Sequence, residues 1–120
     1  MLQINQKLAK KMLLALGYAV LSASDGQEGI DQTLAHDGLI DAILMDQSMP
    51  RKDGVNATRE IRELEHAGKL SRRTPIIAVT AVVNTESKRL FEEAGADDFL
   101  AKPLSLERLR DTLIIHLPRG

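Results

Sequence analysis

Three polar residues with complementary chemistry each stand at the end of a short strand-like segment of this chain. Asp46 follows the apolar run at residues 42–45, and Thr80 and Lys102 follow two further segments of the same kind. A carboxylate can attack phosphorus to give an acyl phosphate. A lysine ammonium can hold the phosphoryl oxygens, and a hydroxyl can donate a hydrogen bond to them. Together the three predict an anion-handling site with its own nucleophile, provided that the carboxylate is exposed.

Each of these residues also has a purely structural interpretation. Asp46 can cap a turn, which Pro50 and Gly54 mark downstream. Thr80 is a β-branched residue suited to a strand, and Lys102 can be a solvated cation paired with a carboxylate. For each residue taken singly, this interpretation is the simpler one. The functional interpretation gains weight because the fold is expected to bring the three together.

Two kinds of segment alternate along the chain and predict that fold. Apolar residues at helical spacing predict helices, and bare apolar runs predict strands. Helices are predicted at residues 4–16, around Ile30 and Leu34 with an end at residues 36–38, from Ala57 to a stop at Gly68, at residues 83–94 and at residues 105–117. The predicted strands cover residues 18–23, 41–46, 76–79 and 98–101. Strict alternation implies parallel strands with right-handed crossovers, so all strand carboxyl ends face one rim. Ligands of such sheets bind beyond these ends, where Asp46, Thr80 and Lys102 fall.

Helical spacing also predicts which side chains face the core. The inward-facing residues of the first, third and last helices are Ile4, Leu8, Met12 and Leu16, then Ala57, Ile61 and Leu64, then Leu106, Leu109, Leu113 and Leu117. The charged residues of the third helix are expected on its solvent side, and they are Arg59, Glu60, Arg62, Glu63 and Glu65.

Composition limits the classes of function. At 120 residues the chain is expected to form a single domain over residues 1–120. The net charge of −1 leaves no excess positive field for a phosphate backbone, which argues against direct nucleic-acid binding. The absence of cysteine is consistent with a reducing compartment, and no apolar run reaches the roughly 20 residues of a membrane span. We therefore expect a cytoplasmic domain without a direct membrane contact.

Three segments resemble those of the receiver domain of two-component response regulators. Residues 44–54 resemble its phosphoacceptor segment, residues 75–81 its switch-hydroxyl strand, and residues 94–103 its lysine segment. Residues 4–7 and the connector at residues 69–75 further resemble receivers attached to hybrid sensor histidine kinases. The resemblance covers nearly the whole chain and implies a flavodoxin-like, doubly wound parallel sheet in three α/β/α layers.

The resemblance also implies roles for the residues of the phosphorylation site. Asp46 would accept a phosphoryl group from a histidine of a kinase or of a histidine phosphotransfer protein. The backbone carbonyl of Ser48, together with Asp46, would bind Mg²⁺. Lys102 would pair with the phosphoryl group and would precede a cis-proline, Pro103.

Two further residues would respond to phosphorylation if the resemblance holds. Thr80 would turn toward the new phosphate, and Phe99 would change rotamer behind it. The surface formed by the fourth helix, the last strand and the last helix would then change. Physically, a new charge of roughly −1.5 to −2 would stabilise one of two pre-existing arrangements. Phe99 also has an ordinary interpretation as a core aromatic residue.

The chain departs from the family pattern at its beginning. In the family, a first strand ends in an acidic pair that binds Mg²⁺, and the matching positions fall at or before residues 1–2. We therefore expect a sheet truncated at the N-terminus, with its first central strand missing. With Asp46 as the only evident carboxylate, we also expect weak Mg²⁺ binding and slow phosphorylation.

A missing central strand would cost stability. About five apolar residues at ~1.5–3 kcal/mol each amount to roughly 10 kcal/mol, which is comparable to the stability of a whole domain. Residues 41–46 would then form an exposed hydrophobic edge that can recruit another chain. The expectation is a homodimer through this edge, an exchanged element, or rearranged strands.

Two alternatives to a working phosphoacceptor remain open at this stage. The first is a pseudo-receiver that keeps the fold and binds partners without being phosphorylated, since the acidic pair is absent. The second is a small phosphatase or hydrolase with Asp46 as its nucleophile. Hydrolases of the haloacid-dehalogenase type need a second carboxylate two residues later, where this chain has Ser48.

Overall fold

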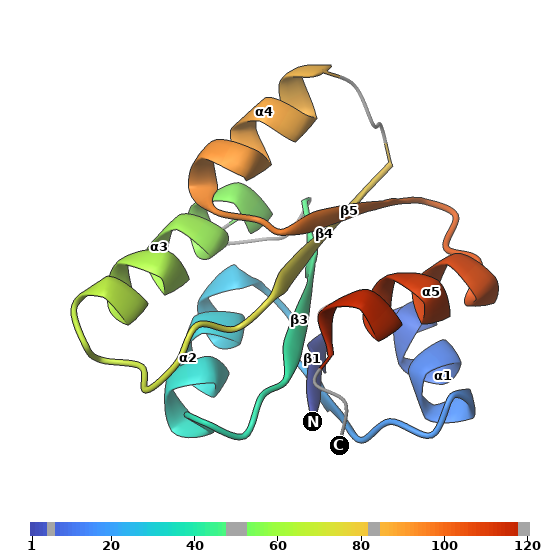
Figure 1. The fold of residues 1–120 in the computed structure, drawn as a ribbon, viewed down its shortest axis with the longest axis horizontal. Coiled ribbons are helices and arrows are strands. Elements are labelled where there is room, and N and C mark those ends of the chain that lie inside the picture. Colours follow the sequence, from blue (N-terminus) through green and yellow to red (C-terminus); the bar gives the residue numbers. More distant parts are fainter. Residues whose placement is uncertain (5–6, 48–52, 82–84, 118–120) are drawn as a thin grey trace.

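The computed structural model describes residues 1–4, 7–47, 53–81 and 85–117, in which strands and helices alternate (Figure 1). The strands are β1 (Leu2–Ile4), β2 (Val20–Ser22), β3 (Ala42–Asp46), β4 (Ile76–Thr80) and β5 (Asp98–Ala101). The helices are α1 (Lys7–Ala15), α2 (Gly26–Ala35), α3 (Gly54–His66), α4 (Thr85–Ala94) and α5 (Leu106–His116). No helix in the described ranges has both the length and the apolar character needed to cross a bilayer.

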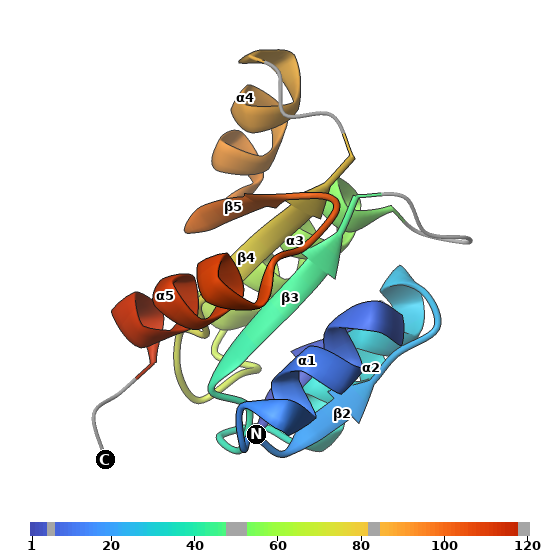
Figure 2. The same cartoon turned by 90° about the vertical axis from the view of Figure 1, so that its right-hand side faces the viewer.

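All five strands form one parallel sheet in the order β2-β1-β3-β4-β5. Helices α1 and α5 cover one face of the sheet, and α2, α3 and α4 lie on the other (Figure 1, Figure 2). Because each crossover helix returns the chain to the same end of the sheet, the carboxyl ends of the strands share one rim. The predicted flavodoxin-like, three-layer α/β/α class is confirmed.

The first central strand, which was expected to be missing, is present as β1. It lies between β2 and β3, with Leu2 opposite Ala42 and Ile4 opposite Leu44. Leu2 and Ile4 are each 1% exposed, so burial between two sheet neighbours outweighs the helical spacing that placed Ile4 in the first helix. Gln3 interrupts the apolar run with a buried amide, which removes the usual sequence signal of a central strand.

This strand also changes the expectation of an exposed edge. Strand β3 is paired with β1 at residues 42–44 and with β4 at residues 43–46, so it is an interior strand of the sheet. The prediction that β3 forms an exposed edge was wrong. The predicted homodimer was based on that edge, so this structural reason for it no longer applies. Dimerisation itself stays an untested prediction.

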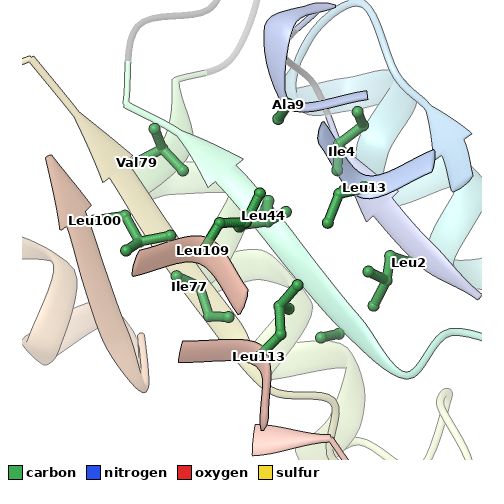
Figure 3. Packing of buried hydrophobic residues seen from close by; sticks show 11 residues of the cluster. Leu2, Ile4, Ala9, Leu13, Leu44, Ile77, Val79, Leu100, Leu109 and Leu113 are labelled. Carbon is green, nitrogen blue, oxygen red and sulfur yellow. The ribbon is translucent and has the colours of Figure 1, made fainter. Parts of the chain in front are cut away.

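The core has two parts, one on each face of the sheet. The part beneath α1 and α5 joins Leu2 and Ile4 of β1 to Leu44, Ile77 and Val79 of the neighbouring strands and to the helix residues Ala9, Leu13, Leu109 and Leu113 (Figure 3). Leu109 and Leu113 face the core as predicted, but Leu106 is 46% exposed. Leu106 is the first residue of α5, directly after the N-cap Ser105, where the helix has only begun to cover the sheet.

Side-chain caps determine where three helices begin. Asp25 accepts a hydrogen bond from the backbone N–H of Glu28 at the start of α2. Asp53 and Ser105 do the same for α3 and α5. Each cap satisfies a backbone donor that has no partner within its helix, which typically contributes about 1 kcal/mol.

Arg62 faces the protein interior, contrary to its predicted place on the solvent side of α3. It is 8% exposed, and its guanidinium donates to Glu65, to Asp97 and to the backbone carbonyls of Thr74 and Gly95 at 2.7–3.0 Å. The side chain of Glu65 is only 6% exposed. This buried charge cluster joins α3 to the segments that lead into β4 and β5.

A second ion pair lies at the opposite end of the sheet from the strand carboxyl ends. The Met1 ammonium donates to Asp41 Oδ2, and Arg72 Nη2 lies 3.3 Å from Asp41 Oδ1. The hydrogen bond from the Met1 ammonium holds the pKa of Asp41 below its ordinary value of 3.8, against desolvation, which raises it.

Because folding lowers this pKa, Asp41 stabilises the fold above pH 3.8, and that contribution is lost as the pH falls through the lowered value. Asp41→Asn should therefore flatten the acid limb of the stability curve by about 0.2–1 kcal/mol, as expected for a partly exposed pair. Urea unfolding from about pH 6 to about pH 2 measures the difference. Identical acid limbs for the two proteins would contradict the prediction.

Candidate functional site

Asp46 and Lys102 form an ion pair at the rim where the strands end. Asp46 is the last residue of β3 and Lys102 follows β5, and Lys102 Nζ lies 2.8 Å from Asp46 Oδ2. The peptide bond between Lys102 and Pro103 is cis, as the resemblance implied. The two residues are 56 positions apart in the sequence, and the parallel sheet brings them together.

The carboxylate is less exposed than expected. The Asp46 side chain retains 8% of its accessible surface, compared with 29% for Lys102. The expectation of a freely exposed carboxylate is therefore wrong for this arrangement. The desolvated setting strengthens the attraction between the two charges and leaves only a small area for an incoming group.

Local backbone contacts fix the position of Asp46. The next residue, Gln47, extends the parallel ladder by donating its N–H to Val79 O at 3.0 Å. Gly54, at the start of α3, donates its N–H to Gln47 O at 3.1 Å. A Cβ at Gly54 would lie 2.2 Å from Asp46 O, so glycine is needed for α3 to begin this close to the end of β3.

Thr80 reaches the same rim but bonds to a residue that the sequence analysis did not single out. It is the last residue of β4, is 1% exposed, and donates its hydroxyl hydrogen to Gln47 Oε1 at 2.6 Å. Because Asp46 is in register with Val79, Gln47 and Thr80 lie one position further along, on the opposite face of the sheet from Asp46. The sequence could have indicated Gln47 as a site residue, because it directly follows Asp46 at the end of the strand.

Phe99 lies on β5 and packs against the part of the core that lies beneath α2, α3 and α4. Its ring meets that of Phe91 edge to face, with centroids 6.4 Å apart, and Lys88 Nζ lies 6.0 Å from its centroid. Phe99 is half-buried, whereas Phe91 is fully buried. The ring is thus covered by the core on one side and by the Lys88 side chain on another.

The donor set only partly fits a magnesium ion. Asp46 supplies one carboxylate, and among the residues that the structure describes no three His, Cys, Asp or Glu side chains are grouped to hold a metal. No aspartate or glutamate precedes Asp25 in the sequence, and the expected ligand Ser48 lies outside the described residues. Magnesium sites commonly combine one or two carboxylates with waters and phosphate oxygens, and Asp46 meets the minimum.

Comparison with known proteins agrees with this geometry. The chain matches the family described as the response regulator receiver domain over residues 3–114. The matched residues include nearly all of the five-stranded parallel sheet and the ion pair between Asp46 and Lys102 at the carboxyl ends of its strands. The chain belongs to the response regulator receiver domain family.

The similar curated proteins are sensor kinases that contain such a region. The chain is 40% identical over 114 residues to histidine protein kinase 1 of Candida albicans, covering 92% of this chain and 5% of that protein. It is 34% identical over 116 residues to the sensor histidine kinase RcsC of Salmonella typhi, covering 97% and 11%. The chain thus spans only a small part of the length of these relatives.

Two solved structures show the same fold. The receiver domain of a sensor histidine kinase from Pseudomonas aeruginosa has a TM-score of 0.83 and 34% identity, with 96% of this chain and 94% of that chain covered. That domain holds a magnesium ion in its active site cleft. A chemotaxis protein of Vibrio cholerae has a TM-score of 0.83 and 26% identity, with 97% and 96% covered. Receiver domains are signalling domains, so the hydrolase alternative has no support from these relatives.

Proposed function

We propose that this chain accepts a phosphoryl group on Asp46 as the receiver of a two-component phosphorelay. The observation that carries the proposal is the 2.8 Å pair between Asp46 and Lys102 at the carboxyl rim of the sheet. It places a nucleophilic oxygen beside a cation that can stay with the transferred group. The donor is a phosphohistidine of a histidine kinase or of a histidine phosphotransfer protein, the partners with which receiver domains interact.

The transfer forms one bond and breaks one. An Asp46 carboxylate oxygen attacks phosphorus as the bond from phosphorus to the donor imidazole nitrogen breaks, which gives an acyl phosphate and a free histidine. Lys102 Nζ, already within hydrogen-bond distance of the carboxylate, moves its interaction to the phosphoryl oxygens. Asp46 would also be a ligand of Mg²⁺, which would further neutralise the phosphoryl charge. With one carboxylate donor, we propose that this ion binds weakly.

The acyl phosphate then changes the domain's surface. The added charge of roughly −1.5 to −2 favours an arrangement in which the Thr80 hydroxyl faces the phosphate and the Phe99 ring changes rotamer. Helix α4, strand β5 and helix α5 follow Thr80 in the chain, and they would present the altered surface to a partner (Figure 1). We place this exchange in the cytoplasm, in keeping with a cysteine-free chain.

A second candidate function is a pseudo-receiver that docks partners without phosphorylation. It is favoured by the absence of a carboxylate in residues 1–24 and by the 8% exposure of the Asp46 side chain. Both features would slow phosphoryl transfer, because Mg²⁺ would have fewer carboxylate ligands and the phosphodonor would have less access to the Asp46 carboxylate.

Acetyl phosphate with Mg²⁺ distinguishes the two functions. We expect intact-mass measurement to show one phosphate-sized gain in the wild-type chain and none in Asp46→Asn, since the amide cannot form an acyl phosphate. Asp111→Asn, at an exposed position on α5, is the matched control and should keep the gain. No gain in the wild-type chain at saturating reagent would establish the pseudo-receiver instead.

A further inference from the structure

We infer that Gln47 is a latch that holds Thr80 in its unphosphorylated orientation, so that its side-chain amide sets how readily the domain switches. The inference rests on the proposed phosphorylation of Asp46 and concerns the regulation of that same site. Its basis is the hydrogen bond from Thr80 Oγ1 to Gln47 Oε1.

The hydroxyl has a single hydrogen to donate, and Gln47 Oε1 is an acceptor within hydrogen-bond distance of it. At 2.6 Å the bond to Gln47 Oε1 is at the short end for a hydroxyl donor, and Thr80 is 1% exposed. To donate to a phosphoryl oxygen on Asp46, Thr80 must first give up this bond. The partly buried setting leaves little water to replace the lost partner, which makes the exchange costly.

The backbone that carries the acceptor is fixed on both sides. The backbone N–H of Gln47 is bonded to Val79 O at 3.0 Å, and its carbonyl accepts from Gly54 N at 3.1 Å. The main chain of Gln47 therefore cannot shift toward Asp46 without breaking the contacts that join β3, β4 and α3. The latch must open at the side-chain bond, since the backbone around it is fixed.

The latch predicts the direction in which a substitution changes affinity for a phosphoryl mimic, because it stabilises only the unmodified arrangement. A ligand shifts a two-state equilibrium by its differential affinity, so removing a bond specific to the unmodified state raises apparent affinity for the modified one. Gln47→Met keeps the length of the side chain and removes the amide acceptor. A typical net hydrogen bond corresponds to roughly fivefold in an equilibrium constant.

The experiment titrates the wild-type chain and Gln47→Met with trifluoroberyllate and Mg²⁺, a mimic of the phosphoryl group. We expect Gln47→Met to bind roughly fivefold more tightly. In a Thr80→Val background, where the donor is absent, the same substitution should change the affinity less than about twofold. Urea unfolding of each variant verifies that it is folded before titration.

The outcomes separate this inference from the proposed function. Equal or weaker binding by Gln47→Met would overturn the latch while leaving phosphorylation of Asp46 intact. A fivefold gain that persists in Thr80→Val would also overturn it, because the effect would not pass through the hydroxyl. No binding by any folded variant, with no mass gain from acetyl phosphate, would instead overturn the proposed function and the latch with it.

A measurement on Thr80 itself needs no substitution at the site. Three-bond couplings should show one dominant χ1 rotamer for Thr80 in the unmodified wild-type chain and a different one after trifluoroberyllate is added. An unchanged rotamer in the loaded protein would contradict the latch, since it predicts that the bond to Gln47 opens.

Discussion

Replacing Arg62 with alanine should destabilise this domain by about 3–5 kcal/mol, the cost typical of breaking a buried ion pair from one side. The guanidinium reaches Glu65 at 2.7 Å and Asp97 at 2.8 Å, and the side chains of these carboxylates are 6% and 17% exposed. Removing the cation leaves the buried Glu65 carboxylate without this ion pair, while Asp97 keeps its pair with Arg73 at 2.6 Å. Against a typical total stability of ~5–15 kcal/mol, the loss is a large fraction of what holds the domain together.

Two backbone carbonyls would lose their Arg62 partner in the same substitution. Arg62 also donates to the carbonyls of Thr74 and Gly95, each at 2.9 Å. These bonds anchor the connector before β4 and the turn before β5. The variant should therefore lose protection from hydrogen exchange at both segments as well as global stability.

Arg59→Ala is the matched control for Arg62→Ala, because it removes the same side chain from an exposed position of the same helix. Its hydrogen bond to Asn56 is exposed, so the change should stay within about 0.5 kcal/mol. Urea unfolding of the three proteins measures both effects. A loss below about 1 kcal/mol for Arg62→Ala would show that the buried cluster is not a major source of stability.

Gly54→Ala should destabilise the domain by about 1–3 kcal/mol or more and displace the carboxylate of Asp46. The new Cβ would lie 2.2 Å from Asp46 O and 2.9 Å from Asp46 C, distances that require backbone movement. Alanine ordinarily favours a helix by up to about 1 kcal/mol over glycine, so the net sign tests which effect dominates. We expect the clash to dominate, because the opposing atoms are main chain and cannot rotate away.

This substitution should also impair the site. Moving Asp46 relative to α3 alters the 2.8 Å contact with Lys102, so acetyl phosphate should modify the variant several-fold more slowly. Asn56→Ala places alanine at an exposed position of the same first turn and is expected to change stability by less than about 0.5 kcal/mol. A Gly54→Ala protein as stable and as reactive as wild type would rule out the close approach of α3 to β3.

Local patterns in the sequence were sufficient for the fold class and for one pair of site residues. The bare apolar runs before Asp46 and Thr80 predicted buried strands, and β3 and β4 are buried along their length. Strict alternation with helices then required the strand ends to share a rim, which brought Asp46 and Lys102 together as expected. These features depend on periodicity and chain order, which any single sequence displays.

Tertiary contacts decided the features that the sequence analysis got wrong or missed. Residues 2–4 became an interior strand because both neighbours offered backbone partners, although Gln3 broke the apolar run. Arg62 turned inward because carboxylates and carbonyls from distant segments surround it, and helical spacing cannot reveal them. The bond between Thr80 and Gln47 likewise joins residues 33 positions apart. Spacing along the chain reports only which face of an element is apolar, whereas pairing between polar groups is decided when the elements pack.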